Sequence, residues 1–496
     1  MNVCSFPFLL GVGLAAILFH LAPWKGPRRL FLTVVNVAFL VTQVPNWRSW
    51  LCFAGFFLLT YGVLRFLKAR PSRDHLIASI GLVVCVFVYL RRYDFVNLLL
   101  GGGWAPNEVL SGVELVGISY IMFKAIHMMV DQWEGQLAPY GLFSYLNYQL
   151  AFFTLLSGPI YRYNDFQEAW QQMDMGPGDA RGTLRCWGRL LIGMLQMGLV
   201  APLLWEGFDR AGRLLFNPSA PDLLQGLAGR FYVYPFYLYF NFAGYTNIAI
   251  GAGGLFGFRV PENFHYPFLS RNMIDFWNRW HITLSWWIRD YVFMTSYKAC
   301  AERFSKWSRL CGYGLLFLAL LIAGVWHGTT FAFVAFGAAH GFGIMAAQIY
   351  TDSLKKGLGR AGFQRYVQSR LIHGAAIVLT FHYICFTFLY FSSGVDGASF
   401  WFFSAMTLMK APGSAFSALR LTWWTGGSIL ALTVLAVAWW NSDRLMAGLR
   451  GAAARLPQRT SLLYAAVCSM AVLTTFVLLA SWALQQKDPV VVYMRF

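Results

Sequence analysis

Long uncharged stretches alternate with short basic segments along the chain. The first four stretches that lack Asp, Glu, Lys and Arg cover residues 1–24, 30–47, 49–64 and 76–90. Because a helix needs roughly 20 apolar residues to cross a bilayer, these stretches predict four closely spaced membrane helices. No Lys or Arg precedes Lys25, so we expect the first helix to be retained and not to be a cleaved signal peptide.

The same pattern continues to the end of the sequence. A run of 39 uncharged residues from Gly312 to Tyr350 is long enough for two membrane passes, or for one pass and a re-entrant piece. We expect roughly 11 to 13 membrane segments in total. The further candidate segments cover residues 117–130, 135–161, 190–205, 231–258, 312–350, 371–395, 421–442 and 460–486.

The composition supports a membrane protein. Hydrophobic residues make up 58% of the chain, aromatic residues 18% and charged residues 12%, against roughly 25% charged residues in a soluble domain. This composition excludes a soluble enzyme. The net charge of +18 fits basic loops that face anionic lipid, and it does not require a nucleic-acid partner.

Basic residues also orient the predicted bundle. They follow the first and third predicted helices, and they gather again in residues 355–370 and 444–459. Positive loops face the cytoplasm, so we expect all four segments on that side and the tail, residues 487–496, outside. The eight cysteines form no CxxC pair and no cluster with histidine, and they predict neither disulfides nor a metal site.

Residues 266–298 differ from a simple membrane span because they mix aromatic and charged side chains. On one continuous helix Trp277, Trp280 and His281 would share a face, and Asp275 would pair with Arg279 four residues later. One interpretation is an amphipathic helix at the membrane interface. The other is a segment that tucks into the protein and lines a polar cavity, because charges at membrane depth need a partner or water.

A second unusual sequence is Val325-Trp326-His327-Gly328, which lies in the middle of the long uncharged run. An ionisable imidazole is rare at membrane depth. Gly324 and Gly328 permit a break in the helix or a close approach of another backbone. We expect His340 to be a packing residue, and His127, which lies in no pattern, to be structural.

These segments together resemble the membrane-bound O-acyltransferase (MBOAT) family. The resemblance covers about residues 110–345, nearly half the chain, and it depends on several motifs that occur in the expected order. The motifs are Phe276-Trp277-Asn278-Arg279-Trp280-His281, Ser285, Arg289-Asp290-Tyr291, Trp326-His327-Gly328, Gly117-Ile118-Ser119-Tyr120, Ser157-Gly158-Pro159-Ile160, Gly244-Tyr245-Thr246-Asn247, Phe256-Gly257-Phe258-Arg259 and Pro261-Glu262-Asn263-Phe264.

Within the family the chain is most similar to DltB-like proteins of D-alanyl transfer, with AlgI-like acetylases as second choice. The resemblance implies an all-α polytopic bundle with re-entrant or tilted segments around a central tunnel. It implies a catalytic core in residues 110–350. Hydropathy predicts N-terminal membrane helices in 1–109 and C-terminal membrane helices in 351–486, and charge placement predicts an extracytoplasmic tail in 487–496. The expected location is the bacterial inner membrane.

The resemblance also implies a reaction, in which an acyl group moves from a cytoplasmic thioester to a hydroxyl across the membrane. His327 matches the family's buried histidine and would be the general base, and His281 would orient or face the substrate. A thioester is already activated, so we expect no bound cofactor and no metal. The donor would be a phosphopantetheine-linked acyl carrier protein or acetyl-CoA. The expected tunnel residues are Asn278, Arg279, Trp280, Ser285 and Trp326.

The tail carries one further resemblance. Residues 491–496, VVYMRF, are similar to an ending found on small partner proteins of DltB-like systems. On that resemblance Tyr493 is a covalent acyl carrier that presents the group to a second, extracytoplasmic transferase. The alternative is an aromatic anchor at the membrane interface.

Several readings of function stay open at this point. The expected partners are an acyl carrier protein on the cytoplasmic side, an extracytoplasmic transferase or acceptor polymer, and membrane lipid, with no nucleic acid. The first alternative is an O-acetyltransferase for an exopolysaccharide. A transporter or a non-catalytic scaffold for envelope assembly would also fit many spans and buried histidines.

Overall fold

The computed structural model describes residues 3–22, 24–93, 96, 110, 112–173, 180–215 and 220–409. These residues form helices and one isolated β-bridge. Six of the helical stretches are long and apolar enough to cross a membrane, namely Trp47–Ala69, Arg73–Arg91, Gly182–Leu214, Ser305–His327, Phe331–Gln368 and Arg370–Ser392. The prediction of an all-α polytopic membrane protein is therefore confirmed. The predicted segments after residue 409, and the tail with Tyr493, lie outside the described residues.

The N-terminal helices follow the predicted uncharged stretches closely. They are α1 (Phe6–Leu21), α2 (Lys25–Gln43), α3 (Trp47–Ala69) and α4 (Arg73–Arg91). Ser5, Asn46 and Ser72 begin α1, α3 and α4, and each side chain accepts a hydrogen bond from a backbone N–H of the first turn. Capping residues therefore set where these helices start, and hydrophobic length sets how far they run.

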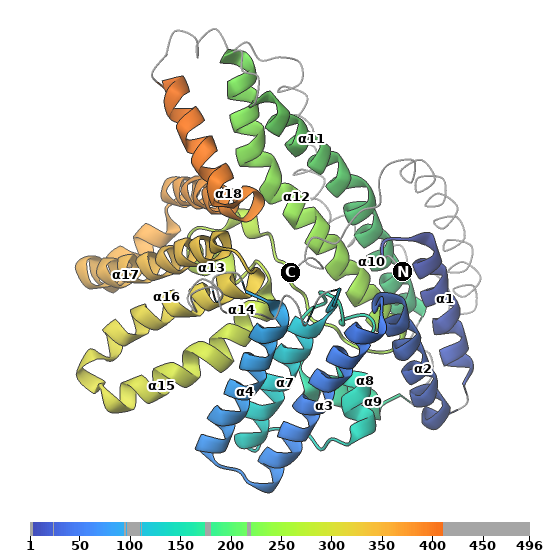
Figure 1. The fold of residues 1–496 in the computed structure, drawn as a ribbon. Coiled ribbons are helices and arrows are strands. Elements are labelled where there is room, and N and C mark those ends of the chain that lie inside the picture. The colour runs from blue at the N-terminus through green and yellow to red at the C-terminus, as the bar shows by residue number, and fades with distance from the viewer. Residues whose placement is uncertain are drawn as a thin grey trace.

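The middle of the chain alternates long and short helices. The long ones are α7 (Ile118–Trp133), α10 (Ala180–Leu195), α11 (Ala201–Leu214), which follows α10 through a π-turn, and α12 (Ala220–Leu255). The short ones are α8 (Leu142–Gln149), α9 (Tyr163–Gln171), α13 (Met273–Trp277) and α14 (Ile282–Ile288). Figure 1 shows the long helices spread around the short helices α13 and α14.

The last described part contains α15 (Met294–Arg303), α16 (Ser308–His327), α17 (Phe331–Gln368) and α18 (Arg370–Met409). The 39-residue uncharged run thus supplies two membrane-length helices, α16 and most of the apolar part of α17, which was one of its two predicted outcomes. A Cβ atom on Gly324 would lie 2.3 Å from the Cα atom of Gly337. The two helices therefore touch backbone to backbone, which is the close approach that the glycines predicted.

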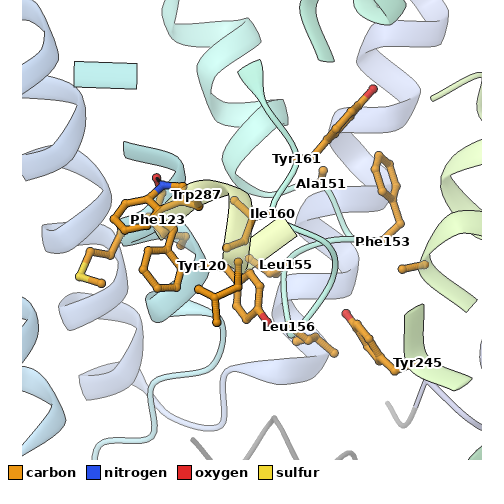
Figure 2. Packing of buried hydrophobic residues seen from close by; sticks show 14 of the residues in the cluster. Tyr120, Phe123, Ala151, Phe153, Leu155, Leu156, Ile160, Tyr161, Tyr245 and Trp287 are labelled. Atoms are coloured by element: carbon orange, nitrogen blue, oxygen red, sulfur yellow. Dashed lines mark hydrogen bonds between the residues drawn. The ribbon is translucent and has the colours of Figure 1, made fainter. Parts of the chain in front are cut away.

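One predicted membrane segment is wrong. Residues 135–161 do not form a spanning helix: only α8 is helical, and residues 150–161 are a non-helical segment in which every residue is buried. Figure 2 shows this segment passing between helices with Leu155, Leu156 and Ile160 packed against their side chains. Its apolar sequence looks like a span because a buried coil and a buried helix have the same hydrophobicity.

Side chains from four helices bond to this buried segment and to the end of α8 before it, since polar groups in a low-dielectric interior require partners. Backbone N–H groups of Phe152, Ser157 and Ile160 donate to Asn36, Tyr245 and Thr283 at 3.0, 3.1 and 3.0 Å. The ammonium group of Lys124 donates to the carbonyls of Tyr148 and Gln149 and to the hydroxyl of Thr154. The segment is therefore held in place by α2, α7, α12 and α14.

Candidate active site

His281 lies where the predicted continuous helix breaks. The structure ends α13 at Trp277 and starts α14 at Ile282, and His281 between them has a left-handed backbone with φ of 45°. Trp277, Trp280 and His281 therefore do not share the face of one helix, as the sequence pattern predicted. The predicted ion pair between Asp275 and Arg279 is present, with 2.7 Å between Oδ1 and Nε. Left-handed non-glycine residues are uncommon and occur often at functional sites.

A short antiparallel contact fixes this break against the chain that precedes it. Phe264 and Trp280 form a β-bridge, and Ile282 N–H donates to the carbonyl of Asn263 at 2.9 Å. The side chain of His281 is fully buried, and its Nδ1 lies 3.4 Å from Oδ1 of Asn263. Asn263 stood in the sequence only as part of a family motif, so its contact with His281 is a finding of the structure.

His327 is the last residue of α16, and only 2% of its surface is exposed. Its neighbours are aromatic: the ring centroids of Trp326, Phe336 and Phe391 lie 4.6, 6.0 and 5.5 Å from that of His327. Gly328 ends the helix in an extended conformation, which is the predicted break. The imidazole is therefore held at a helix end by the shape of its neighbours.

The fold brings His281 and His327 to the same place. The Trp326 ring is near both, with its centroid 4.6 Å from that of His327 and 6.4 Å from that of His281. The indole N–H of Trp326 has no hydrogen-bond partner among the described residues. Buried indole N–H groups usually find a partner, so this one is available to a bound reactant.

His340 lies beside this pair in α17. Its ring packs 4.3 Å from Phe336 and 5.3 Å from Trp277, and within the described ranges neither of its nitrogens has a hydrogen-bond partner. The predicted packing role fits these aromatic contacts.

Of the other predicted site residues, Trp280 and Ser285 contact the break at His281, whereas Asn278 and Arg279 directly follow α13. Trp280 is buried, and its ring stacks on Phe276 at 5.6 Å. Ser285 donates weakly to the carbonyls of Trp280 and His281, both at 3.3 Å. Asn278 is exposed at the end of α13, and Arg279 faces Asp275. Their role as tunnel residues, like the tunnel itself, stays a prediction, and Tyr493 lies outside the described residues.

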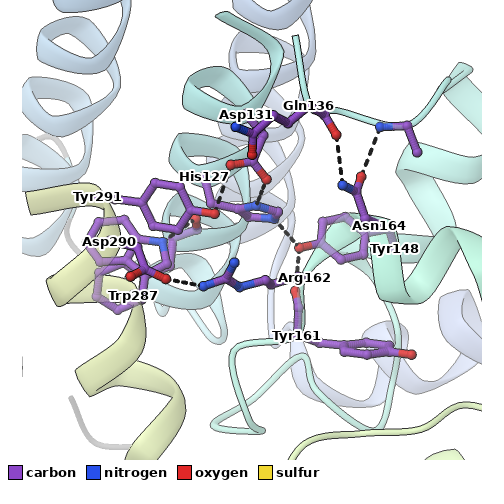
Figure 3. A network of polar contacts seen from close by, with 12 residues as sticks. His127, Asp131, Gln136, Tyr148, Tyr161, Arg162, Asn164, Trp287, Asp290 and Tyr291 are labelled. Atoms are coloured by element: carbon purple, nitrogen blue, oxygen red, sulfur yellow. Dashed lines mark hydrogen bonds and ion pairs between the residues drawn. The ribbon is translucent and has the colours of Figure 1, made fainter. Parts of the chain in front are cut away.

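A polar network that sequence reasoning missed lies next to this site. His127 Nε2 is 2.6 Å from the hydroxyl of Tyr148, and its Nδ1 is 3.3 Å from the carboxylate of Asp131. Tyr291 donates to Asp131 at 2.9 Å, and Arg162 pairs with Asp290. Figure 3 shows these side chains converging from α7, α8 and the π-turn after α14. The spacing His-x-x-x-Asp in α7 was the available signal, but it is common in helices that carry no site.

The network borders a pocket with a volume of about 50 Å³, enough for a few water molecules. Arg162, Asp165 and Tyr291 line one part of it, and Ile160 and Thr283 line another. Thr283 donates to the same oxygen of Asn263 that faces His281. The pocket is therefore two side chains away from the buried imidazole.

The pocket lies at the end of the bundle where α3 finishes. Next to Asp131, Gln132 donates to the carbonyl of Leu64 at 3.0 Å, and Tyr140 donates to the same carbonyl at 3.2 Å. The basic turn that follows α3 contains Arg65, Lys68, Arg70 and Arg73. The positive-inside rule predicts that this end faces the cytoplasm.

The described residues contain no group of three His, Cys, Asp or Glu side chains that could hold a metal ion. What the site offers instead is a pair of buried imidazoles, an indole N–H and a polar pocket at one end of the bundle. Positioned imidazoles are the commonest general bases in proteins. The arrangement is suited to proton transfer from a hydroxyl group.

Comparison with known proteins extends this description. The sequence model of the membrane-bound O-acyltransferase family matches residues 112–393. The chain is 30% identical to the teichoic acid D-alanyltransferase of Streptococcus thermophilus over 409 residues, which is 79% of this chain and 94% of that protein. It is 33% identical to the teichoic acid D-alanyltransferase of Bacillus subtilis over 300 residues, 58% of this chain and 70% of that protein.

A relative of the second predicted kind is also similar. The probable alginate O-acetylase AlgI of Pseudomonas aeruginosa is 30% identical over 323 residues, which cover 62% of this chain and 59% of that protein. Residues 112–393, which the family model matches, contain His281, His327, Asn263 and the packed pair α16 and α17. The resemblance to the family that the sequence motifs indicated is confirmed. The chain belongs to the membrane-bound O-acyltransferase family and is a multi-pass membrane acyltransferase.

Proposed function

We propose that this protein transfers an acyl group from a cytoplasmic thioester to a hydroxyl of a cell-envelope polymer. The first candidate for this group is D-alanyl. The two D-alanyltransferase relatives support this choice, because both are named for transfer to teichoic acid. The observation that carries the proposal is the pair of buried imidazoles, His281 and His327, which both lie near the ring of Trp326. The inner membrane is the proposed location, because it separates the donor from the envelope.

His327 is the general base of the proposed reaction. A hydroxyl attacks a thioester slowly until a base takes its proton, and a positioned imidazole accelerates this step by roughly 10² to 10⁴-fold. His281 orients the reactants, and Trp326 offers its indole N–H to one of them. The thioester supplies the energy of the transfer, so the step needs no nucleotide and no metal.

The donor arrives from the side of the pocket beside Arg162 and Thr283. Two observations support this direction: the basic turn after α3 lies at the same end of the bundle, and Thr283 leads through Asn263 to His281. The arm of a phosphopantetheine-linked acyl carrier protein, or of acetyl-CoA, is larger than about 50 Å³, so its binding widens the pocket. Basic side chains at this end suit an acidic carrier protein and the phosphates of acetyl-CoA equally.

The test of the base is a pair of histidine variants measured in membranes with radiolabelled donor. His327→Ala should lower transfer by roughly 10² to 10⁴-fold while the protein still accumulates in the membrane. His340→Phe is the matched control, because His340 is an equally buried histidine with aromatic neighbours, and it should keep near-normal transfer. Near-normal transfer by His327→Ala would remove the role of general base from His327.

The acyl group is tested by the donor itself. Membranes should incorporate label from a D-alanyl carrier protein and not from acetyl-CoA. The AlgI relative supports the second candidate, O-acetylation of an exopolysaccharide, and label from acetyl-CoA alone would establish that reaction in place of D-alanyl transfer.

Tyr493 is the proposed covalent relay at the extracytoplasmic end of the chain. Its hydroxyl would receive the acyl group and present it to a second transferase or to the acceptor polymer. Tyr493→Phe deletes the hydroxyl and keeps the ring, so it should stop delivery to the polymer. Unchanged delivery by this variant would assign Tyr493 to the interface as an anchor.

A further inference from the structure

The amide of Asn263 is fixed in the protein interior by contacts other than the one with His281. Asn263 is fully buried, and its backbone carbonyl accepts from Ile282. Its side-chain oxygen Oδ1 faces two groups of Thr283, the backbone N–H at 3.1 Å and the hydroxyl at 2.7 Å. The amide is therefore tied to the start of α14 by both its main chain and its side chain.

The orientation of this amide follows from its neighbours. The backbone N–H of Thr283 can only donate. The Thr283 hydroxyl accepts from the N–H of Ile160 at 3.0 Å, so its own hydrogen is left to donate to Asn263. A reversed amide would place an NH₂ group against two donors. The oxygen of Asn263, and not its nitrogen, must therefore face Thr283 and His281.

The orientation of the amide decides the tautomer of His281. Its Nδ1 lies 3.4 Å from Oδ1 of Asn263, an oxygen that can only accept. An unprotonated Nδ1 would place two lone pairs against each other, so Nδ1 carries a hydrogen. A neutral imidazole has one ring hydrogen, and Nε2 then keeps the lone pair.

We propose that Asn263, held by Thr283, is a positioning residue that fixes His281 as the Nδ1–H tautomer and presents Nε2 to the reactants as a hydrogen-bond acceptor. This role rests on the proposed acyl transfer, since it concerns the nitrogen with which His281 orients a reactant. It is the arrangement in which a neighbouring acceptor on one ring nitrogen prepares the other nitrogen for chemistry. A neutral amide does this without adding a charge to the buried site.

The direct test reads the tautomer by ¹⁵N NMR of protein labelled in its histidine rings. The His281 signals are assigned by their loss in His281→Gln. Wild-type protein should show a protonated Nδ1 and an unprotonated Nε2 at His281, and Asn263→Leu should show a mixture of both tautomers. A protonated Nε2 in the wild type would overturn the proposal, whatever the activity.

Kinetics separate positioning from a merely structural role. Asn263→Leu should lower kcat about 10 to 100-fold, the usual cost of losing a residue that orients a functional histidine, with KM for the donor little changed. Thr283→Val should lower kcat less, and Thr283→Ser, which keeps the hydroxyl, should restore it. Equal kcat for Thr283→Val and Thr283→Ser would contradict the role of the hydroxyl.

The matched control is Asn36→Leu. Asn36 is another fully buried asparagine, and it accepts from the backbone N–H of Phe152 in the buried non-helical segment. Its loss should lower thermal stability and leave the His281 tautomer unchanged. If Asn36→Leu shifted the tautomer as Asn263→Leu does, the effect would be structural. Absence of acyl transfer in wild-type membranes would overturn the proposed function and leave the tautomer assignment standing.

Discussion

The two histidines of the site are held in different ways. His327 ends a helix among aromatic rings, and its position depends on the shapes of Trp326, Phe336 and Phe391. His281 lies in a left-handed turn, where its ring packs 4.7 Å from that of Phe242 and its Nδ1 faces the oxygen of Asn263. Both imidazoles are packed among rings, and His281 has in addition a polar contact that orients it.

The difference bears on what each ring can do. The rings around His327 place it by shape, and that placement does not depend on which of its nitrogens carries a hydrogen. A ring held by an acceptor keeps one tautomer. In the other tautomer a lone pair of the ring nitrogen would face a lone pair of the acceptor oxygen. Packing therefore suits the proposed base, His327, and hydrogen bonding suits the orienting role of His281.

Among substitutions that keep both histidines and Asn263, the largest effect is expected where the packing of His327 is disturbed. A Cβ atom on Gly328 would lie 2.1 Å from the ring of Phe333, which packs on Phe391 beside His327. Gly328→Ala must displace that ring, and overpacking costs about 1–3 kcal/mol. We expect transfer to fall about tenfold or more in membranes that contain normal amounts of protein.

Gly314→Ala is the control for this variant. Gly314 lies on the same helix, α16, and nothing described lies within 4 Å of the Cβ atom that the substitution adds. Transfer by Gly314→Ala should be unchanged. Equal activity of the two variants would mean that His327 does not depend on the packing beside Gly328.

A smaller effect, on stability, is expected on the hydrogen-bonded side. Lys124→Met would leave the carbonyls of Tyr148 and Gln149 and the hydroxyl of Thr154 without their buried donor. We expect a loss of about 2 kcal/mol in the free energy of unfolding, seen as a lower melting temperature of the purified protein in detergent. The control is Lys306→Met at an exposed position, which should melt like the wild type. An unchanged melting temperature of Lys124→Met would show that the segment after Tyr148 does not depend on Lys124.

The smallest effect is expected at the rim of the pocket. Burial raises the pKa of Asp290, but Arg289 and Arg162 more than offset this and leave the pKa below its usual value. The ion pair therefore survives at about pH 4, where a free aspartate is half protonated. It is lost only as the pH falls through the lowered pKa of Asp290. Asp290→Asn should change KM for the donor less than about fivefold, and the wild type should show no change from this pair above about pH 5. A larger change in KM would place the donor in direct contact with Asp290.

The sequence predicted those features that repeat along the chain or depend on a local pair. Uncharged length located α1 to α4 and the two helices α16 and α17, and spacing of four residues located the pair of Asp275 and Arg279. The glycines beside His327 correctly indicated a break and a close contact. These predictions succeed because hydrophobic length and helical spacing act locally.

The sequence could not predict features that need partners from distant parts of the chain. Residues 150–161 look like a span, and only the donors and acceptors of other helices make a coil possible there. The contact of Asn263 with His281 joins residues 18 positions apart, next to the antiparallel bridge of Phe264 and Trp280. Periodicity suggested one helix through His281, but the backbone turns at that residue.

The buried coil of residues 150–161 has a consequence for how the protein assembles. A helix satisfies its own backbone as it enters the membrane, whereas this coil depends on groups from α2, α7, α12 and α14. It can settle only after α14, the last of these four to be synthesised, has docked. The ribosome therefore completes the chain through α14 before the coil takes its final shape, and the site cannot be complete until then.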